Sequence, residues 1–276
     1  EAYRSSLSEE QLDAMVEKTK ALEAYQEAGE DPKALECIPM LKRSDIKREA
    51  AKIINEELTV DDSLFLYHDV CTNGIGYVDL MFKTDSIAPE QIPYLGLLKS
   101  VLGYVDTENY TYGELFNEIN ANTGGINCGV EVFDRADSTE EFQAMFSVRG
   151  KALYTKMDFL FKMIGEILNS SKLEDTKRLY EIVASVKSRA QVNLTGAGHS
   201  TAVLRAAAYS SPMAAFQDEM AGIGYYQFIE KLEKDFEQRK EETVEELCKL
   251  MKKILRPENF MISYTGAVSY THLRAH

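Results

Sequence analysis

The spacing of hydrophobic positions predicts helices at the start of the chain. Residues 8–50 contain no alternating segment, and Ser8 followed by Gln11 is typical of a capping box that opens a helix. The apolar residues of the following stretch fall roughly on one helical stripe: Leu12, Met15, Val16, Leu22 and Tyr25. A break follows at Gly29. We therefore predict a helical hairpin over residues 1–50.

Between residues 63 and 83 the period changes to two, which is typical of strands. Phe65 and Tyr67 precede the dipeptide Asn73-Gly74. After it, the apolar residues alternate: Val78, Leu80 and Phe82. Because Asn and Gly both tolerate positive φ, this pattern predicts a β-hairpin that turns at Asn73-Gly74.

Two helices and two more strands are expected next. The helices cover residues 89–103 and 111–122, and Thr111 with Glu114 forms a capping box for the second. Gly124-Gly125 ends that helix. Alternation returns over residues 126–133 and 142–148, so the sheet has at least four strands.

Helices dominate after residue 153. Apolar residues recur there at helical spacing: Leu153, Met157, Leu160, Phe161, Ile164, Ile167 and Leu168. Ser171 and Glu174 are expected to cap the next helix, and further helices are expected over residues 200–210, 212–221 and 225–255, before Pro257. Residues 260–265 form a predicted strand. Strands, a helical block and a final strand indicate an α+β fold and not a doubly wound sheet.

Composition and charge narrow the classes of partner. The chain has 276 residues, 45% of them hydrophobic, and a net charge of −14. This acidic excess argues against nucleic acid as a partner. No apolar run approaches the roughly 18 residues of a membrane span, and the first residues lack the pattern of a signal peptide. We therefore expect no membrane partner and a cytoplasmic location. Four dispersed cysteines are typical of free thiols in a reducing compartment.

Residues 94–133 combine two helix-like segments, a Gly-rich turn and an alternating strand, and they resemble the centre of an insulinase-type (pitrilysin-type) zinc peptidase domain. In active domains of that family the first helix carries His-x-x-Glu-His, which holds zinc and activates water. The same places here read Leu95, Gly96, Leu97, Leu98 and Lys99. An aliphatic side chain cannot ligate zinc and an ammonium group repels it. The resemblance therefore implies a non-catalytic copy of the domain.

Four segments extend the resemblance to the presequence protease branch of these metallopeptidases: ECIPMLKRSDI, TNGIGYVDLMF, EINANTGGIN and GHSTAVLRAAAYSSPMAAFQDEMAGIGYYQFI. The resemblance implies four α+β domains in one long chain, joined by a helical hairpin between halves and closed around a chamber. On this interpretation residues 51–266 are the non-catalytic third domain, a mainly antiparallel sheet covered by helices. Zn²⁺ is expected only in an N-terminal domain that this chain lacks. The expected partners are the other parts of the same chain and unfolded peptide substrates.

No catalytic or metal-binding residue is assigned, and no substrate-binding residue is identified. The four histidines, His68, His199, His272 and His276, are not spaced as a helical ligand pair. Glu118 lies where an acid completes the zinc site of active domains, yet without other ligands we interpret it as a solvated helix residue.

Three other features have a functional and a structural interpretation, and we favour the structural one. Residues 195–200, with His199 or Arg205 nearby, suggest an anion site or a turn between helices, and the helical segment before them favours the turn. Tyr225, Tyr226 and Phe228 suggest a peptide-contacting patch or core residues. The charges of residues 230–246 suggest a basic partner or a solvated helix face.

The ends of the chain raise separate expectations. The chain does not begin with Met, so we expect its start to lie upstream. Residues 267–276, AVSYTHLRAH, resemble a translated sequencing adapter, with a disordered tail as the alternative. The predicted function is a non-catalytic part of a zinc metalloendopeptidase that forms chamber wall and scaffold. The alternatives are a stand-alone inactive subunit that binds a separate active chain, and a helical scaffold unrelated to peptidases.

Overall fold

The computed structural model of the protein describes residues 3, 6–29, 32–50, 52–60, 63–135 and 137–267. The expectation for the last ten residues therefore concerns a segment that lies, except for Ala267, outside the described residues. The chain divides into two compact units, Glu1–Ile53 and Ile54–His276.

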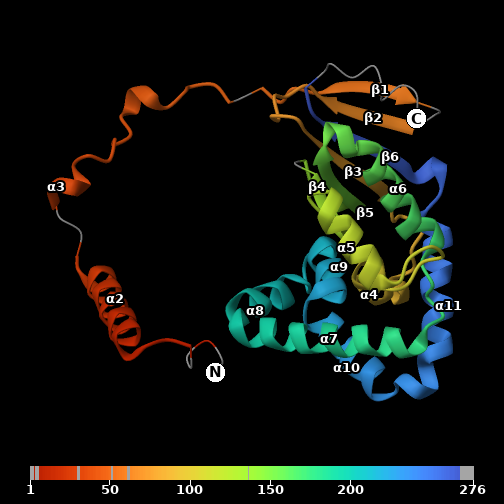
Figure 1. The fold of residues 1–276 in the computed structure, drawn as a ribbon. Helices are drawn as coiled ribbons and strands as arrows, with labels where there is room; N and C mark the ends of the chain where they lie inside the picture. The colour runs from red at the N-terminus through yellow and green to blue at the C-terminus, as the bar shows by residue number, and fades with distance from the viewer. Residues whose placement is uncertain are drawn as a thin grey trace. The chain divides into compact units, whose positions relative to one another are not determined.

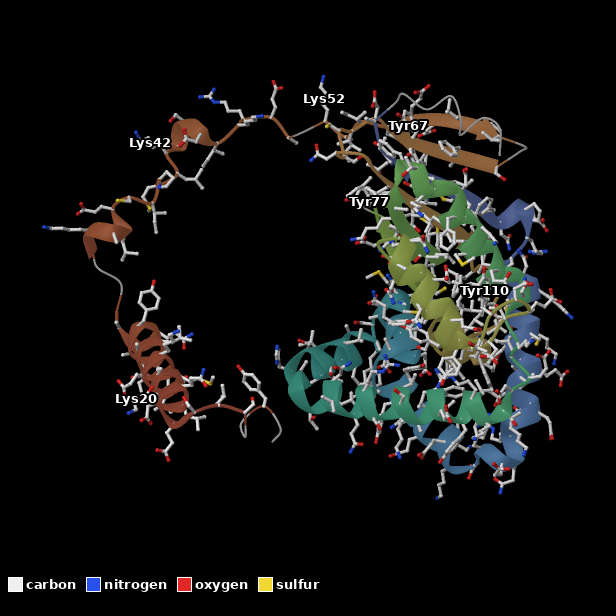
Figure 2. All side chains as sticks on the ribbon, in the orientation of Figure 1. Lys20, Lys42, Lys52, Tyr67, Tyr77 and Tyr110 are labelled. Carbon is white, nitrogen blue, oxygen red and sulfur yellow. The ribbon has the colours of Figure 1, made fainter. Side chains whose placement is uncertain are left out.

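The first unit is built around one helix, α2 (Glu9–Glu27). The capping box predicted at its start is confirmed, because Ser8 Oγ accepts a hydrogen bond from the Gln11 backbone and Gln11 Oε1 accepts one from the Ser8 backbone. After it come a single turn, α3 (Pro32–Leu35), and a 3-10 turn, η1 (Arg43–Asp45). The second helix of the expected hairpin is thus one turn long. No residue of α2 is buried, and its side chains project from all sides of the helix (Figure 2).

The second unit contains a six-stranded sheet with the order β1-β2-β6-β3-β5-β4. The strands are β1 (Glu56–Val60), β2 (Ser63–His68), β3 (Ile75–Lys83), β4 (Ile126–Arg135), β5 (Ser138–Leu153) and β6 (Phe260–Thr265). Neighbours are antiparallel except β2 and β6, which are parallel. The predicted α+β class is confirmed.

The predicted hairpin at Asn73-Gly74 is wrong in its pairing. Both residues have the expected positive φ, 53° and 86°. The strands on either side nevertheless do not pair, because β6 lies between them: Tyr264 pairs with Tyr67 of β2 and with Val78 of β3. The hairpin that does form joins β1 to β2.

Helices cover one face of the sheet (Figure 1). They are α4 (Ile92–Val101), α5 (Tyr112–Asn122), α6 (Met157–Ser170), α7 (Thr176–Gly196), α8 (Gly198–Ala207), α9 (Pro212–Ala221), α10 (Ile223–Lys234) and α11 (Phe236–Ile254), with 3-10 turns η2 (Pro89–Gln91), η3 (Tyr154–Lys156) and η4 (Pro257–Asn259). Alternate residues of β3 and β5, such as Val78 and Phe146, enter the core beneath them. Side chains fill the space between sheet and helices (Figure 2).

The capping box predicted at Ser171 and Glu174 is wrong. Ser171 Oγ donates to the Ile167 carbonyl, at 2.6 Å, and so belongs to the end of α6. The cap of α7 is Asp175, whose carboxylate accepts from the Arg178 backbone at 3.0 Å.

The helix predicted over residues 225–255 is two helices, α10 and α11, with Asp235 between them. The break places Phe236, which is 2% exposed, against Tyr180 of α7, with ring centroids 5.3 Å apart.

Candidate functional site

Helix α4 is the centre of the helical layer. It contacts α7, α9, α10, α11 and strand β4. Most of its residues are buried: Pro93, Tyr94, Leu95, Gly96, Leu97, Leu98 and Val101. A helix that is hydrophobic all round is typical of a buried position, and α4 fits that description except at its last turn.

The positions that the resemblance assigns to a zinc motif lie on this helix. Leu95 and Leu98 are buried in the core, with 0% and 1% of their surface exposed. Gly96 lets α4 approach its neighbours closely, since a Cβ there would lie 2.6 Å from the Met220 carbonyl oxygen and 2.7 Å from the Tyr225 ring. These residues do not fit a zinc ion, because none of them offers a lone pair and Lys99 adds a positive charge. Among the described residues, no group of three or more His, Cys, Asp or Glu side chains is placed to hold a metal ion.

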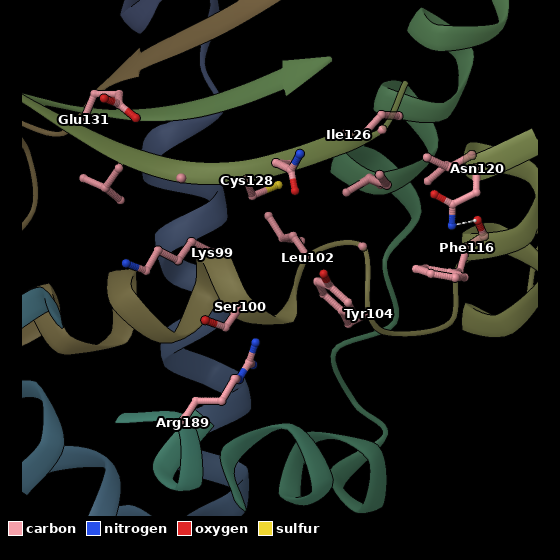
Figure 3. Close-up of a pocket in the computed structure, with 17 residues that line it drawn as sticks. Lys99, Ser100, Leu102, Tyr104, Phe116, Asn120, Ile126, Cys128, Glu131 and Arg189 are labelled. Atoms are coloured by element: carbon pink, nitrogen blue, oxygen red, sulfur yellow. Dashed lines mark hydrogen bonds between the residues drawn. The ribbon is translucent and has the colours of Figure 1, made fainter. Parts of the chain in front are cut away.

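A cavity of about 590 Å³ lies beside the last turn of α4 (Figure 3). Its polar lining includes Lys99, Ser100, Tyr104, Asn120 and Arg189. Its apolar lining comes from Leu102, Phe116, Ile119, Ile126, Val130 and Ile167. Cavities of this size are within the range of about 300–1,000 Å³ that is typical of ligand pockets.

Strand β4 forms one wall of the cavity. All residues from Gly125 to Glu131 line it. Within the described part of the sheet, β4 pairs only with β5, so its other edge keeps unpaired backbone donors and acceptors. Figure 3 shows Cys128 extending from β4 toward α4. Burial raises the pKa of the Cys128 thiol to about 12, so this thiol is protonated at neutral pH and is not a nucleophile.

Two cations of the cavity have no anionic partner. Neither Lys99 nor Arg189 forms an ion pair or a hydrogen bond with another side chain in the part of the chain that the structure describes. The nearest acid in the lining, Glu131, is paired with Arg149 at 3.1 Å. Lys99 is half-buried, and desolvation lowers the pKa of its ammonium group. Figure 3 shows Arg189 reaching from α7 toward Ser100.

The Tyr225 hydroxyl lies near the same corner of the fold. It is buried without a hydrogen-bond partner among the described residues. Burial raises the pKa of Tyr225, and the neighbouring Ser100 hydroxyl and Arg189 guanidinium partly offset that rise. The unpaired hydroxyl and the unpaired cations together make this corner rich in hydrogen-bond donors.

The second face of the sheet has its own cavity, of about 420 Å³. Its polar lining includes Asp79, Asn127, Arg149, Lys151 and Ser263. Arg149 donates to Asp79 at 2.7 Å, and the same guanidinium contacts Glu131. These charges satisfy one another, so this cavity lacks the imbalance of the first.

The structure separates the other residues that the sequence singled out. Glu118, on α5, accepts a hydrogen bond from Asn122 at 3.2 Å. His68 bonds the Ile54 carbonyl and Ser263, and His199 is exposed on α8. His272 and His276 lie outside the described residues.

The turn over residues 195–200 joins α7 to α8, as expected. Arg205 is not available to an anion there, because it is paired with the buried Asp218 at 2.6 Å. Tyr225 and Phe228 are core residues, and Phe228 packs edge-on against Tyr94 with centroids 4.8 Å apart. The charges of residues 230–246 pair along their own helix, for example Arg239 with Glu242.

The sequence does not predict the cavity as a site, although it contains a signal. At the zinc-motif positions Lys99 has meaning only as a residue that repels zinc. Both Lys99 and Arg189 lack an acidic residue three or four positions away on their helices, which distinguishes them from cations in solvated helix pairs.

Comparison with known proteins places the chain among peptidases. A family model described as "Peptidase M-16C associated" matches residues 1–232. Protein HypA of Clostridium perfringens is 35% identical over 266 residues, which are 96% of this chain and 27% of that protein. Presequence protease 1 of Arabidopsis thaliana is 26% identical over 96% of this chain and 24% of its own length. The mitochondrial presequence protease of Saccharomyces cerevisiae is 28% identical over 96% of this chain and 28% of its own.

The chain therefore spans about a quarter of the length of these relatives. A crystal structure of a conserved protein from Enterococcus faecalis V583 is similar with a TM-score of 0.57 and 14% identity, over 80% of this chain and 50% of that one. This likeness shows the fold alone. No described helix is both long and apolar enough to cross a membrane.

Proposed function

This chain belongs to the peptidase-associated family whose model matches residues 1–232, and from that membership we propose that it is a non-catalytic part of a zinc metalloendopeptidase that degrades unfolded peptides. The resemblance to the presequence protease branch is confirmed by the matches over 96% of the chain. The observation that carries the proposal is the combination of this kinship with Leu95 and Lys99 at the zinc-motif positions.

In this proposal the zinc ion and its ligands belong to another domain of a longer chain. The role of the present segment is enclosure and scaffolding, as part of the wall of a chamber around the substrate. Two features support it. The second face of the sheet is not covered by helices, and it presents polar groups such as Arg149 and Lys151. The apolar stripe of α2 is exposed, with Val16 49% and Tyr25 78% accessible, and a further part of the same chain would bury such a surface.

A hydrolysis assay on the purified chain tests the non-catalytic role. A fluorogenic unfolded peptide is incubated with residues 1–276, with added Zn²⁺ and with EDTA. We expect no turnover above the protein-free control and no stoichiometric zinc after gel filtration. Zinc-dependent turnover that copurifies with the chain would contradict the proposal.

The reading frame in the source DNA tests the larger assignment. Long-read sequencing across both ends of this segment is expected to find His-x-x-Glu-His upstream and a further domain downstream. A frame that closes at both ends would favour a stand-alone inactive subunit instead, and pull-down with a separate active chain would then be the next measurement.

A further inference from the structure

We propose that the cavity beside α4 binds a carboxylate of a peptide, with Lys99 as the principal counter-charge and Arg189 as a second cation. The choice of a peptide as ligand rests on the proposed function, whereas the choice of a carboxylate rests on the cavity itself. The site uses none of the groups of a zinc centre.

The first argument is the charge balance of the cavity. A half-buried ammonium group has lost part of its hydration, and such a group is costly unless an anion or several acceptors replace the lost water. Lys99 has no such partner among the described residues, and Glu131 is already engaged by Arg149. The protein therefore places an uncompensated positive charge in a cavity although its net charge is −14. A carboxylate in this place would restore the balance.

The second argument is the character of the walls. Leu102, Phe116 and Ile126 supply an apolar surface next to the cations. A peptide end or an acidic residue with apolar neighbours matches this mixture, because it presents one negative charge beside aliphatic groups. Polyanions fit less well, since the acidic protein as a whole repels them.

The third argument is the room for the main chain of a ligand. The lining contains a continuous run of an edge strand, Gly125 to Glu131, and the unpaired backbone groups of that edge lie along the cavity. An extended peptide segment can hydrogen-bond to such groups, whereas a small inorganic anion cannot use them.

Isothermal titration calorimetry on residues 1–276 tests the proposal with three probes. They are the N-acetylated hexapeptide Ala-Ser-Ala-Val-Ala-Leu as free acid, its C-terminal amide, and the amide with Glu in third place. Charge-assisted hydrogen bonds are worth about 1.5–3 kcal/mol, so we expect at least one carboxylate probe to bind about tenfold or more tightly than the uncharged amide. Tighter binding of the free acid identifies a chain terminus, and tighter binding of the Glu peptide identifies a side chain. Equal binding of all three, or no binding, would overturn the proposal.

Variants locate the effect. Lys99→Met keeps the aliphatic stem and is expected to abolish the preference for a carboxylate, while Arg189→Gln reduces it in part. Lys177→Met, on the exposed side of α7 and outside the cavity, is the matched control and is expected to keep the wild-type preference. A preference that survives Lys99→Met in a folded protein would overturn the assignment.

Carbodiimide crosslinking of the wild-type protein avoids any folding defect of a variant. The activated carboxylate of the bound probe forms an amide with the nearest lysine amine. Mass spectrometry is expected to find the crosslink at Lys99, and crosslinks at exposed lysines alone would contradict the site. Neither measurement depends on hydrolysis, so binding and the peptidase assignment can fail independently.

Discussion

The Nη1 atom of Arg205 lies 2.6 Å from Oδ2 of Asp218, a carboxylate that is only 1% exposed. The same carboxylate accepts the backbone N–H groups of Ile223 and Gly224, at 3.0 and 3.1 Å. Asp218 thus fastens α8 and the start of α10 to α9. A residue that the sequence suggested for anion binding is instead a structural cation.

Removal of this carboxylate is expected to destabilise the fold. Asp218→Ala leaves two buried backbone donors and one guanidinium without their acceptor, and we expect a loss of roughly 2–4 kcal/mol in the free energy of unfolding. Urea denaturation followed by circular dichroism measures it. Glu245→Ala, at a side chain that is 66% exposed, is the control and is expected to change little. Equal stability of both variants would contradict the structural role of Asp218.

Close packing at Gly96 predicts a steric effect. A Cβ at this position would meet the backbone oxygen of Met220 at 2.6 Å, and backbone cannot rotate away. We expect Gly96→Ala to lower the free energy of unfolding by about 1–3 kcal/mol. Gly165→Ala is the matched helical control, because its nearest neighbour would be 3.9 Å away, and it is expected to be neutral or stabilising by roughly 0.5–1 kcal/mol. Thermal unfolding of the two variants separates packing from helix propensity.

The four cysteines are expected to differ in reactivity. Cys37 and Cys71 are exposed, whereas burial raises the pKa of Cys128 to about 12 and that of Cys248 above its ordinary value. Because the thiolate is the reactive form, iodoacetamide at pH 8 should label Cys37 and Cys71 rapidly and the other two slowly. Peptide mass spectrometry over a time course measures this, and all four should react after denaturation. Rapid labelling of Cys128 in the folded protein would contradict its burial.

Acid is expected to weaken the contact between α6 and the loop before α5. Hydrogen bonds from Thr107 and Asn109 hold the pKa of Glu166 below its ordinary value of 4.5. A carboxyl group with a depressed pKa stabilises the folded state above its unfolded pKa, and this stability is lost as the pH falls through the folded pKa. The free energy of unfolding of the wild type should therefore drop below about pH 4.5, and that of Glu166→Gln should drop less. Parallel curves for the two proteins between pH 6 and pH 3 would contradict the prediction.

Local elements can be predicted from the sequence because their signals are local. The capping box of Thr111 and Glu114 forms as predicted, with the Glu114 backbone donating to Thr111 Oγ1 at 3.3 Å. The strand predicted over residues 260–265 has the observed bounds, Phe260–Thr265. In each case neighbouring residues contain the whole pattern.

The errors concern choices that distant residues decide. Asn73-Gly74 adopts the turn conformation that its sequence favours, yet the position of β3 depends on β6, and the pair His68 and Ser263 is 195 residues apart. The cavity escapes prediction for a similar reason. Its cations come from α4 and α7 and its wall from β4, so no single segment contains it.

The place of β6 has a consequence for synthesis on the ribosome. β6 pairs with β2 on one side and with β3 on the other. Until residues up to Thr265 have left the exit tunnel, β2 and β3 each carry an unpaired edge, which is the kind of surface on which nascent chains associate wrongly. The middle of this sheet is therefore the last part of it to be made.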